Sequence, residues 1–183
     1  MLPVTPATPT PGAAPAFAPV TADPVSWEPL PTIPGTHVPA SRTVRFADQY
    51  LKDAFEGREF LIFDGGMGSM IQASSAPQDQ LPELLNLTHS QVITDIHRQY
   101  VKAGSQVITT NTFGANARKL EGRASVAQVF AAAVACARNS GARYVAADLG
   151  PTGALLEPLG TLSFQEAYDL YAEQVHAAVD AGA

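Results

Sequence analysis

The residues most able to do chemistry form a short loop, Asp64-Gly65-Gly66, directly after the apolar run 60–63. An aspartate at this point puts a carboxylate at the mouth of a sheet. The two glycines leave backbone N–H groups that a ligand can approach closely. A carboxylate beside free amides suits a zwitterion, because the acid pairs with an amine and the amides receive a carboxyl group. The alternative is that Asp64 caps a helix and the glycines only form its turn.

Two further loops carry polar or turn-forming residues after apolar runs. Asn111 and Thr112 offer neutral hydrogen-bonding groups, and each side chain could equally well cap local structure. The Gly-Pro-Thr-Gly stretch at 150–153 predicts a rigid turn that shapes its loop. A nucleotide site is disfavoured, since the glycines around Met67 match neither the Gly-x-Gly-x-x-Gly spacing nor a Gly-Lys-Ser/Thr ending.

The elements that must position these loops alternate between helix and strand. Apolar periodicity predicts helices over about 46–55, 90–103, 125–139 and from 163 onward, and short buried strands over 60–63, 106–110 and 143–147. Such alternation implies βαβ crossovers and a parallel sheet, in which ligands bind at the C-terminal ends of the strands. A third small-residue turn occurs at 180–183, where we expect a further strand to begin.

The last of these helices carries a predicted inward face. It opens with a capping box, Ser163 to Glu166. Its spacing predicts that the following side chains point inward: Phe164, Ala167, Tyr168, Tyr171, Val175 and Ala178. Two histidines lie on predicted helices, His97 beside an apolar stripe and His176 off it, and neither position favours a catalytic role.

Composition narrows the possible partners and location. Residues 1–42 hold eleven of the fifteen prolines, which predicts a disordered Pro/Ala/Thr-rich tail before a domain over 43–183. A net charge of −6 with scattered basic residues argues against nucleic acid, and no apolar run predicts a membrane span. Cys136 is the single cysteine, so an intrachain disulfide and a thiol-rich metal site are excluded. With no signal or presequence pattern, we expect a cytoplasmic protein.

Several collinear motifs carry a family resemblance. They lie at 60–72, 82–88, 96–100, 109–116 and 149–153. Their order resembles that of the homocysteine S-methyltransferase family, and more narrowly the N-terminal homocysteine-binding domain of cobalamin-dependent methionine synthases. Two positions depart mildly from the family pattern, Ser69 for a common threonine and Thr110 for a frequent acid.

The resemblance implies a fold, a substrate and a cofactor. The fold would be a truncated (β/α)8 TIM barrel, with an N-terminal helix and the first three βα units. Asp64, Gly65, Gly66 and Thr112 would bind the amino-acid end of homocysteine. The family holds the substrate thiol on zinc, but its strand-four acid and three zinc-binding cysteines have no counterpart in this sequence. The methyl donor, a cobalamin or a folate, would be supplied elsewhere.

Three interpretations follow. The first is a fragment of a homocysteine methyltransferase in methionine synthesis, inactive alone, with a separate chain or downstream domain completing the barrel. The second is a non-catalytic small-molecule-binding α/β module. The third is a complete flavodoxin-like protein that binds an anion at its strand ends. The first predicts a chain that binds no stoichiometric zinc and is prone to aggregate through unpaired strand edges.

Overall fold

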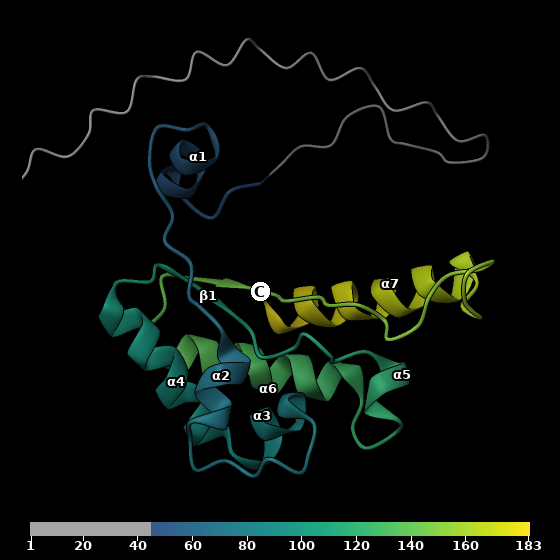
Figure 1. Ribbon diagram of the computed structural model, residues 1–183. Coiled ribbons are helices and arrows are strands. Elements are labelled where there is room, and N and C mark those ends of the chain that lie inside the picture. Colours follow the sequence, from purple (N-terminus) through teal and green to yellow (C-terminus); the bar gives the residue numbers. More distant parts are fainter. Residues whose placement is uncertain (1–44) are drawn as a thin grey trace, which may run out of the picture. The chain divides into compact units, whose positions relative to one another are not determined.

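The computed structural model describes residues 45–183, and the predicted tail over 1–42 lies outside the described residues. The described part is an α/β fold with a small parallel sheet, as the sequence predicts (Figure 1). Its elements run in the order α1 (Gln49–Phe55), α2 (Met67–Gln72), the 3-10 helix η1 (Pro82–Leu84), α3 (Leu85–Thr88), α4 (Ser90–Ala103), β1 (Val107–Thr109), α5 (Ala117–Leu120), α6 (Val126–Asn139), β2 (Tyr144–Ala146) and α7 (Phe164–Ala181).

The sheet contains two strands and one extended segment beside them. β1 and β2 pair in parallel with Val107 opposite Tyr144 and Thr109 opposite Ala146. On the other side of β1, Phe63 forms a single parallel bridge with Val107. The Ile62 carbonyl oxygen accepts hydrogen bonds from the backbone N–H groups of residues 106 and 107, at 2.8 and 3.1 Å. The spatial order is therefore the segment near 63, then β1, then β2.

The prediction of a buried strand over 60–63 is wrong. The segment forms one bridge instead of a strand, and Phe60 is 86% exposed while Ile62 is 56% exposed. An apolar run becomes a doubly buried strand only where elements cover both faces of the sheet. Within residues 45–183 these side chains stay open to solvent.

Several ends of the long helices lie at capping residues that are visible in the sequence. Ser125 and Ser163 each open a helix with a complete capping box, so that two backbone N–H groups are satisfied at each start. α4 spans the predicted residues and ends at Gly104, whose φ of 109° lies in the left-handed region that glycine adopts readily. These termini fix the lengths of the connections to β1 and β2.

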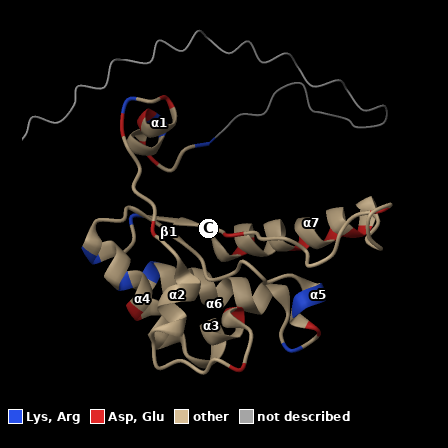
Figure 2. Ribbon diagram, in the orientation of Figure 1, with Lys and Arg blue, Asp and Glu red and all other residues tan. Residues whose placement is uncertain are grey.

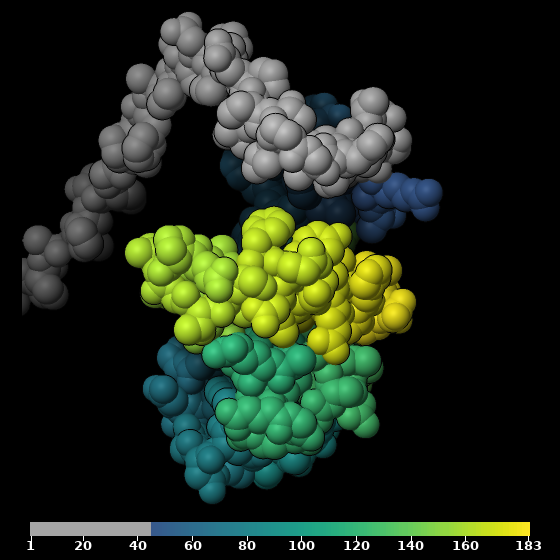
Figure 3. Space-filling model, turned by 90° about the vertical axis from the view of Figure 1, so that its right-hand side faces the viewer, coloured from purple at the N-terminus to yellow at the C-terminus, as the bar shows by residue number. Residues whose placement is uncertain are grey.

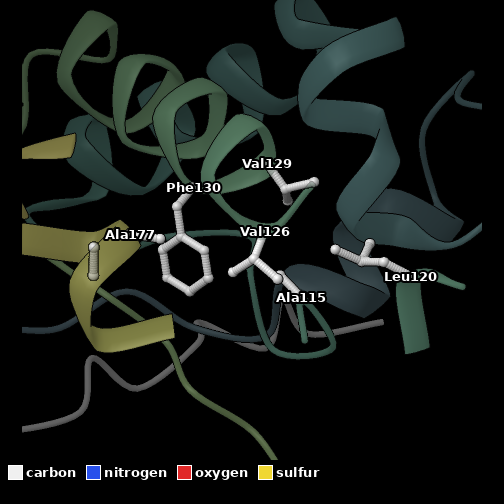
Figure 4. Packing of buried hydrophobic residues seen from close by; sticks show 7 residues of the cluster. Ala115, Leu120, Val126, Val129, Phe130 and Ala177 are labelled. Carbon is white, nitrogen blue, oxygen red and sulfur yellow. The ribbon is translucent and has the colours of Figure 1, made fainter. Parts of the chain in front are cut away.

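The core lies between α6 and its neighbours. In Figure 4 the Phe130 ring packs beside Val126 of α6 and close to Ala177 of α7. Ala115 and Leu120, also fully buried, come from the loop after β1 and from α5. A second cluster gathers apolar side chains of α2, α3 and α4 together with Cys136 of α6. α6 is therefore the central helix, in contact with both clusters.

α7 packs on α6 through its small residues. Figure 3 shows the yellow C-terminal helix and the loop before it lying across the green residues that include α6. Ala167 and Ala178 are buried as predicted, but Phe164 is 75% exposed, and Tyr168, Tyr171 and Val175 are exposed as well. The predicted inward face is thus wrong for its large side chains. Alanines let the helices approach closely, and the bulky side chains lie on the outer face.

α1 contacts the start of the sheet by polar interactions. Asp48, the N-cap of α1, accepts hydrogen bonds from the Tyr144 hydroxyl at 2.7 Å and from Arg143 at 3.2 Å. The Arg143 guanidinium lies 4.2 Å from the centroid of the Tyr50 ring. None of the α1 residues is buried, so this helix adds contacts to the strands and no core. Over 45–183, none of the helices combines the length and apolar character that a membrane crossing requires.

Candidate functional site

A cavity of about 330 Å³ lies at the C-terminal ends of the parallel segments. Three separate parts of the chain and one further residue meet there. The walls consist of the glycine loop 65–68, the pair Pro82 and Glu83, the end of β1 with residues 109–111 and Phe113, and Asp148 after β2. The sequence predicts this edge of the sheet as the ligand site. The glycine loop and the end of β1 line one cavity there, whereas residues 150–153 do not line it.

Asp64 binds β1 with both carboxylate oxygens. The Thr109 backbone N–H donates to Oδ2 at 3.0 Å, and the Thr109 hydroxyl donates to Oδ1 at 2.8 Å. The side chain is half-buried, and burial raises the pKa of its carboxyl group although the two bonds from Thr109 act to lower it. Gly66 is the N-cap of α2, so the alternative in which Asp64 caps this helix is wrong. Asp64 borders the cavity behind Thr109 and does not line it.

Gly65 and Gly66 line the cavity and are held by Tyr100 of α4. A Cβ atom at Gly65 would lie 3.1 Å from the Tyr100 ring, so a glycine permits this close approach. The Tyr100 hydroxyl donates to the Gly66 carbonyl oxygen at 3.2 Å, and Ser69 Oγ donates to the same oxygen at 2.9 Å. The N–H groups of both glycines donate no hydrogen bond to residues of the described chain. The loop therefore offers two free amides.

Thr112 lies behind the cavity wall and is fully buried. Its hydroxyl donates to the Asp148 carbonyl oxygen at 2.7 Å and lies 2.6 Å from Thr110 Oγ1. Thr110 Oγ1 in turn accepts from the Asp148 backbone N–H at 3.1 Å. If the Thr110 hydroxyl donates to Thr112 Oγ1, both hydroxyls and both backbone groups of Asp148 have hydrogen-bond partners. The two threonines thus fix the backbone of Asp148 from both sides.

Glu83 is a cavity residue that the sequence motifs contain but do not single out. Its side chain is buried, and Oε1 accepts from the Gly114 backbone N–H at 2.6 Å. Asn86 ties the same region to β1, since its amide donates to the carbonyl oxygens of Glu83 and Asn111 at 2.8 and 2.7 Å. The Asn111 amide donates to the Pro82 carbonyl oxygen at 2.7 Å. These bonds hold residues 82–86 against the loop after β1.

Asp148 supplies a carboxylate directly to the cavity wall. Burial raises the pKa of its carboxyl group, and the negative charges of Asp64 and Glu83 raise it further. Asp148 directly follows the predicted strand 143–147, as Asp64 follows the run 60–63, so the local signal that singles out Asp64 also marks Asp148.

The electrostatic character of the cavity is acidic. Its described lining contains Glu83 and Asp148 and no Lys, Arg or His, and Asp64 lies beside it. Figure 2 shows the Lys and Arg residues of the described part dispersed over several elements, with a pair on α5. Lys119 of that pair lies with Nζ 5.6 Å from the centroid of Phe113, a residue of the cavity wall. The interior of the cavity therefore favours a ligand group with a positive charge.

The described residues do not fit a zinc ion. Within 45–183 there is no group of three His, Cys, Asp or Glu side chains that could hold a metal. Cys136 belongs to the second core cluster, where Sγ lies 3.6 Å from the Ser90 carbonyl oxygen, and burial raises the pKa of its thiol. A thiolate ligand needs the opposite shift. No step of a reaction can be assigned to zinc on these residues.

Comparisons with known proteins agree on one family. A family model described as homocysteine S-methyltransferase matches residues 61–183. Methionine synthase of Mycobacterium leprae is 31% identical over 154 residues, and that of Mycobacterium tuberculosis is 30% identical over 158 residues. These matches cover 74% and 75% of this chain but only 13% of each relative.

Solved structures show a matching fold. The homocysteine methyltransferase MmuM from Escherichia coli, in its oxidized form, matches with a TM-score of 0.62 and 18% identity, over 74% of this chain and 55% of MmuM. Its metallated form matches with a TM-score of 0.57 and 20% identity, over 71% of this chain and 54% of MmuM. The chain thus spans about half the length of MmuM.

Proposed function

This chain belongs to the homocysteine S-methyltransferase family, and we propose that it binds the amino-acid end of homocysteine for methyl transfer to the thiol. The observation that carries the proposal is the meeting of the Gly65-Gly66 loop, the end of β1 and Asp148 around one cavity. Free backbone amides and a carboxylate in one cavity are complementary to a zwitterion.

The four residues named from the sequence take different parts in this proposal. The amides of Gly65 and Gly66 would receive the ligand carboxyl group. Asp64 would add negative charge beside the ligand amine while its two bonds hold Thr109 in the wall. Thr112 would act through Asp148, whose carbonyl oxygen it binds, because its own hydroxyl is buried and already paired.

We propose further that the described residues are the first part of a (β/α)8 barrel. Three parallel segments in chain order, 62–64, β1 and β2, support this arrangement, as does the match to about half of MmuM. A downstream domain or a separate chain would complete the barrel. We also propose that the protein is cytoplasmic.

In this proposal zinc and the methyl donor are bound outside the described residues. The described residues lack a set of metal ligands, so activation of the homocysteine thiol needs ligands from elsewhere. A methylcobalamin or methylfolate would likewise be bound outside these residues. The same lack of metal ligands favours a second candidate function, a non-catalytic module that binds a small amino acid.

The test combines binding with turnover. The full chain is titrated with L-homocysteine by calorimetry, then assayed for methionine formation with zinc and each methyl donor, alone and with the remaining part of a related barrel. We expect weak binding alone and turnover only after complementation. Binding that never leads to turnover would favour the non-catalytic module, and an absence of binding would refute both.

A further inference from the structure

We propose that Asp148 is a specificity-determining residue that selects ligands with a free ammonium group by pairing its carboxylate with that group. The inference rests on the proposed function, because it assigns one end of the same ligand to a residue that neither the family match nor the sequence motifs designate. It concerns the substrate class, namely unblocked amino acids rather than thiols in general.

The backbone of Asp148 is held in place while its carboxylate has no partner within the described residues. Its backbone N–H donates to Thr110 Oγ1, and its carbonyl oxygen accepts from Thr112 Oγ1, so both backbone groups are fixed. The carboxylate itself accepts no hydrogen bond and forms no ion pair with residues of the described chain. A positioned charged group without a partner, in the wall of a cavity, is what recognition of an opposite charge requires.

The other two carboxylates at the cavity already accept hydrogen bonds from the protein. Asp64 is occupied by Thr109 through both oxygens, and Glu83 Oε1 is occupied by the Gly114 N–H. Asp148 is thus the least occupied of the three. Burial and the negative charges of Asp64 and Glu83 make the ionised form of Asp148 costly in the empty cavity. A cationic group of the ligand would relieve this cost, whereas an anionic group would add to it.

The cavity wall combines backbone donors with the Asp148 carboxylate. Gly65 and Gly66, with free amides, line the same cavity as Asp148. The cavity therefore contains donors for a carboxylate and an acceptor for an ammonium group. The described wall holds no Lys or Arg that could neutralise Asp148 in the absence of ligand.

The experiment removes the charge on each side of the proposed pair. Full-length wild type, Asp148→Asn and Asp148→Glu are titrated with L-homocysteine and with 4-sulfanylbutanoic acid, which has the same thiol and carboxyl group but no amine. The matched control is Asp180→Asn, an exposed aspartate of α7 outside the cavity wall. Backbone amide NMR spectra of each variant verify that the fold is unchanged.

We expect Asp148→Asn to weaken homocysteine binding about tenfold, because the amide oxygen still accepts a hydrogen bond but lacks the negative charge that pairs with the ammonium group. Binding of the desamino thiol should stay equal or improve, and Asp148→Glu should restore part of the homocysteine affinity. If Asp148→Asn lowers the affinity for both ligands equally, or for neither, the assignment of Asp148 is overturned. If wild type binds no homocysteine, the proposed function itself fails, which is a different result from loss of discrimination.

Discussion

Asp64 and Thr109 form a two-point contact in which both carboxylate oxygens of Asp64 accept hydrogen bonds from a single residue of β1. The contact joins residues that are 45 positions apart in the chain. It fastens the glycine loop to the neighbouring strand at the point where the cavity opens. Asp64 therefore serves the site by fixing its wall as well as by its charge.

This contact predicts the effect of shortening Asp64. Asp64→Ala leaves the Thr109 N–H and hydroxyl without their partners, so the free energy of unfolding should fall by about 1–3 kcal/mol. Asp64→Asn should cost less, because an amide oxygen still accepts from Thr109. Urea unfolding followed by circular dichroism measures both variants. Equal stability of Asp64→Ala and wild type would contradict the importance of the contact.

The glycine at 114 gives a second prediction, with an internal control. A Cβ atom at Gly114 would lie 2.5 Å from Glu83 Oε1, whereas a Cβ atom at Gly68 would meet nothing within 4 Å. Gly114→Ala must displace the buried Glu83 carboxylate and should lose about 1–3 kcal/mol of stability together with ligand binding. Gly68→Ala lies within α2 and should gain up to about 1 kcal/mol from helix propensity. Thermal unfolding of the two variants measures both changes in stability. If Gly114→Ala is as stable as wild type, Glu83 is free to move.

His97 makes stability depend on pH. It is fully buried with both ring nitrogens unpaired within the described structure, and burial lowers its pKa to about 4. Between pH 6.5 and 4 the unfolded chain therefore binds a proton that the folded chain does not. The stabilising contribution of His97 to the free energy of unfolding is fully present above pH 6.5. It declines as the pH falls and is about 3 kcal/mol smaller at pH 4.

His97→Met should remove that part of the pH dependence. The measurement is the difference in unfolding free energy between pH 7.5 and 4.5, compared between wild type and variant, so that packing changes common to both pH values cancel. His176→Met on α7 is the control, because His176 is exposed. An unchanged difference in His97→Met would mean that folding does not lower the pKa of His97.

The exposed side chains of α7 predict self-association of the chain alone. Phe164 is 75% and Val179 is 66% exposed, and the segment near Phe60 leaves a further apolar edge. Sedimentation velocity should show oligomers that grow with concentration, and fewer of them in a Phe164→Ser, Val179→Ser double variant. A double variant at the exposed polar positions Gln165 and Asp180 controls for the change to serine. A strictly monomeric wild type at high concentration would contradict this prediction.

The sequence predicted the parts of the fold that depend on local pattern. α4 spans the predicted residues, and β1 and β2 each lie one residue inside their predicted ends. The predictions that are wrong concern which side chains are buried. The run 60–63 and the large side chains of α7 are apolar enough for a core, but burial depends on which elements cover them, and that is not a local property.

For the site, too, only the features that depend on local sequence are predictable. The glycine loop stands out because its residue types are unusual for a strand end. Tyr100 and Glu83 do not stand out, because their contacts with the loops join distant positions: the hydroxyl of Tyr100 reaches Gly66 across 34 residues, and Glu83 reaches Gly114 across 31. Asp148 has the same local signal as Asp64, since each directly follows a predicted strand.

The most direct test of the central claim, that this cavity binds the amino-acid end of homocysteine, is an NMR titration of the ¹⁵N-labelled full chain with L-homocysteine. We expect the largest amide shifts at Gly65 and Gly66 and smaller shifts at 109–113 and Asp148, all of which saturate as the ligand concentration rises. Shifts confined to other surfaces, or no shifts at any concentration, would contradict it.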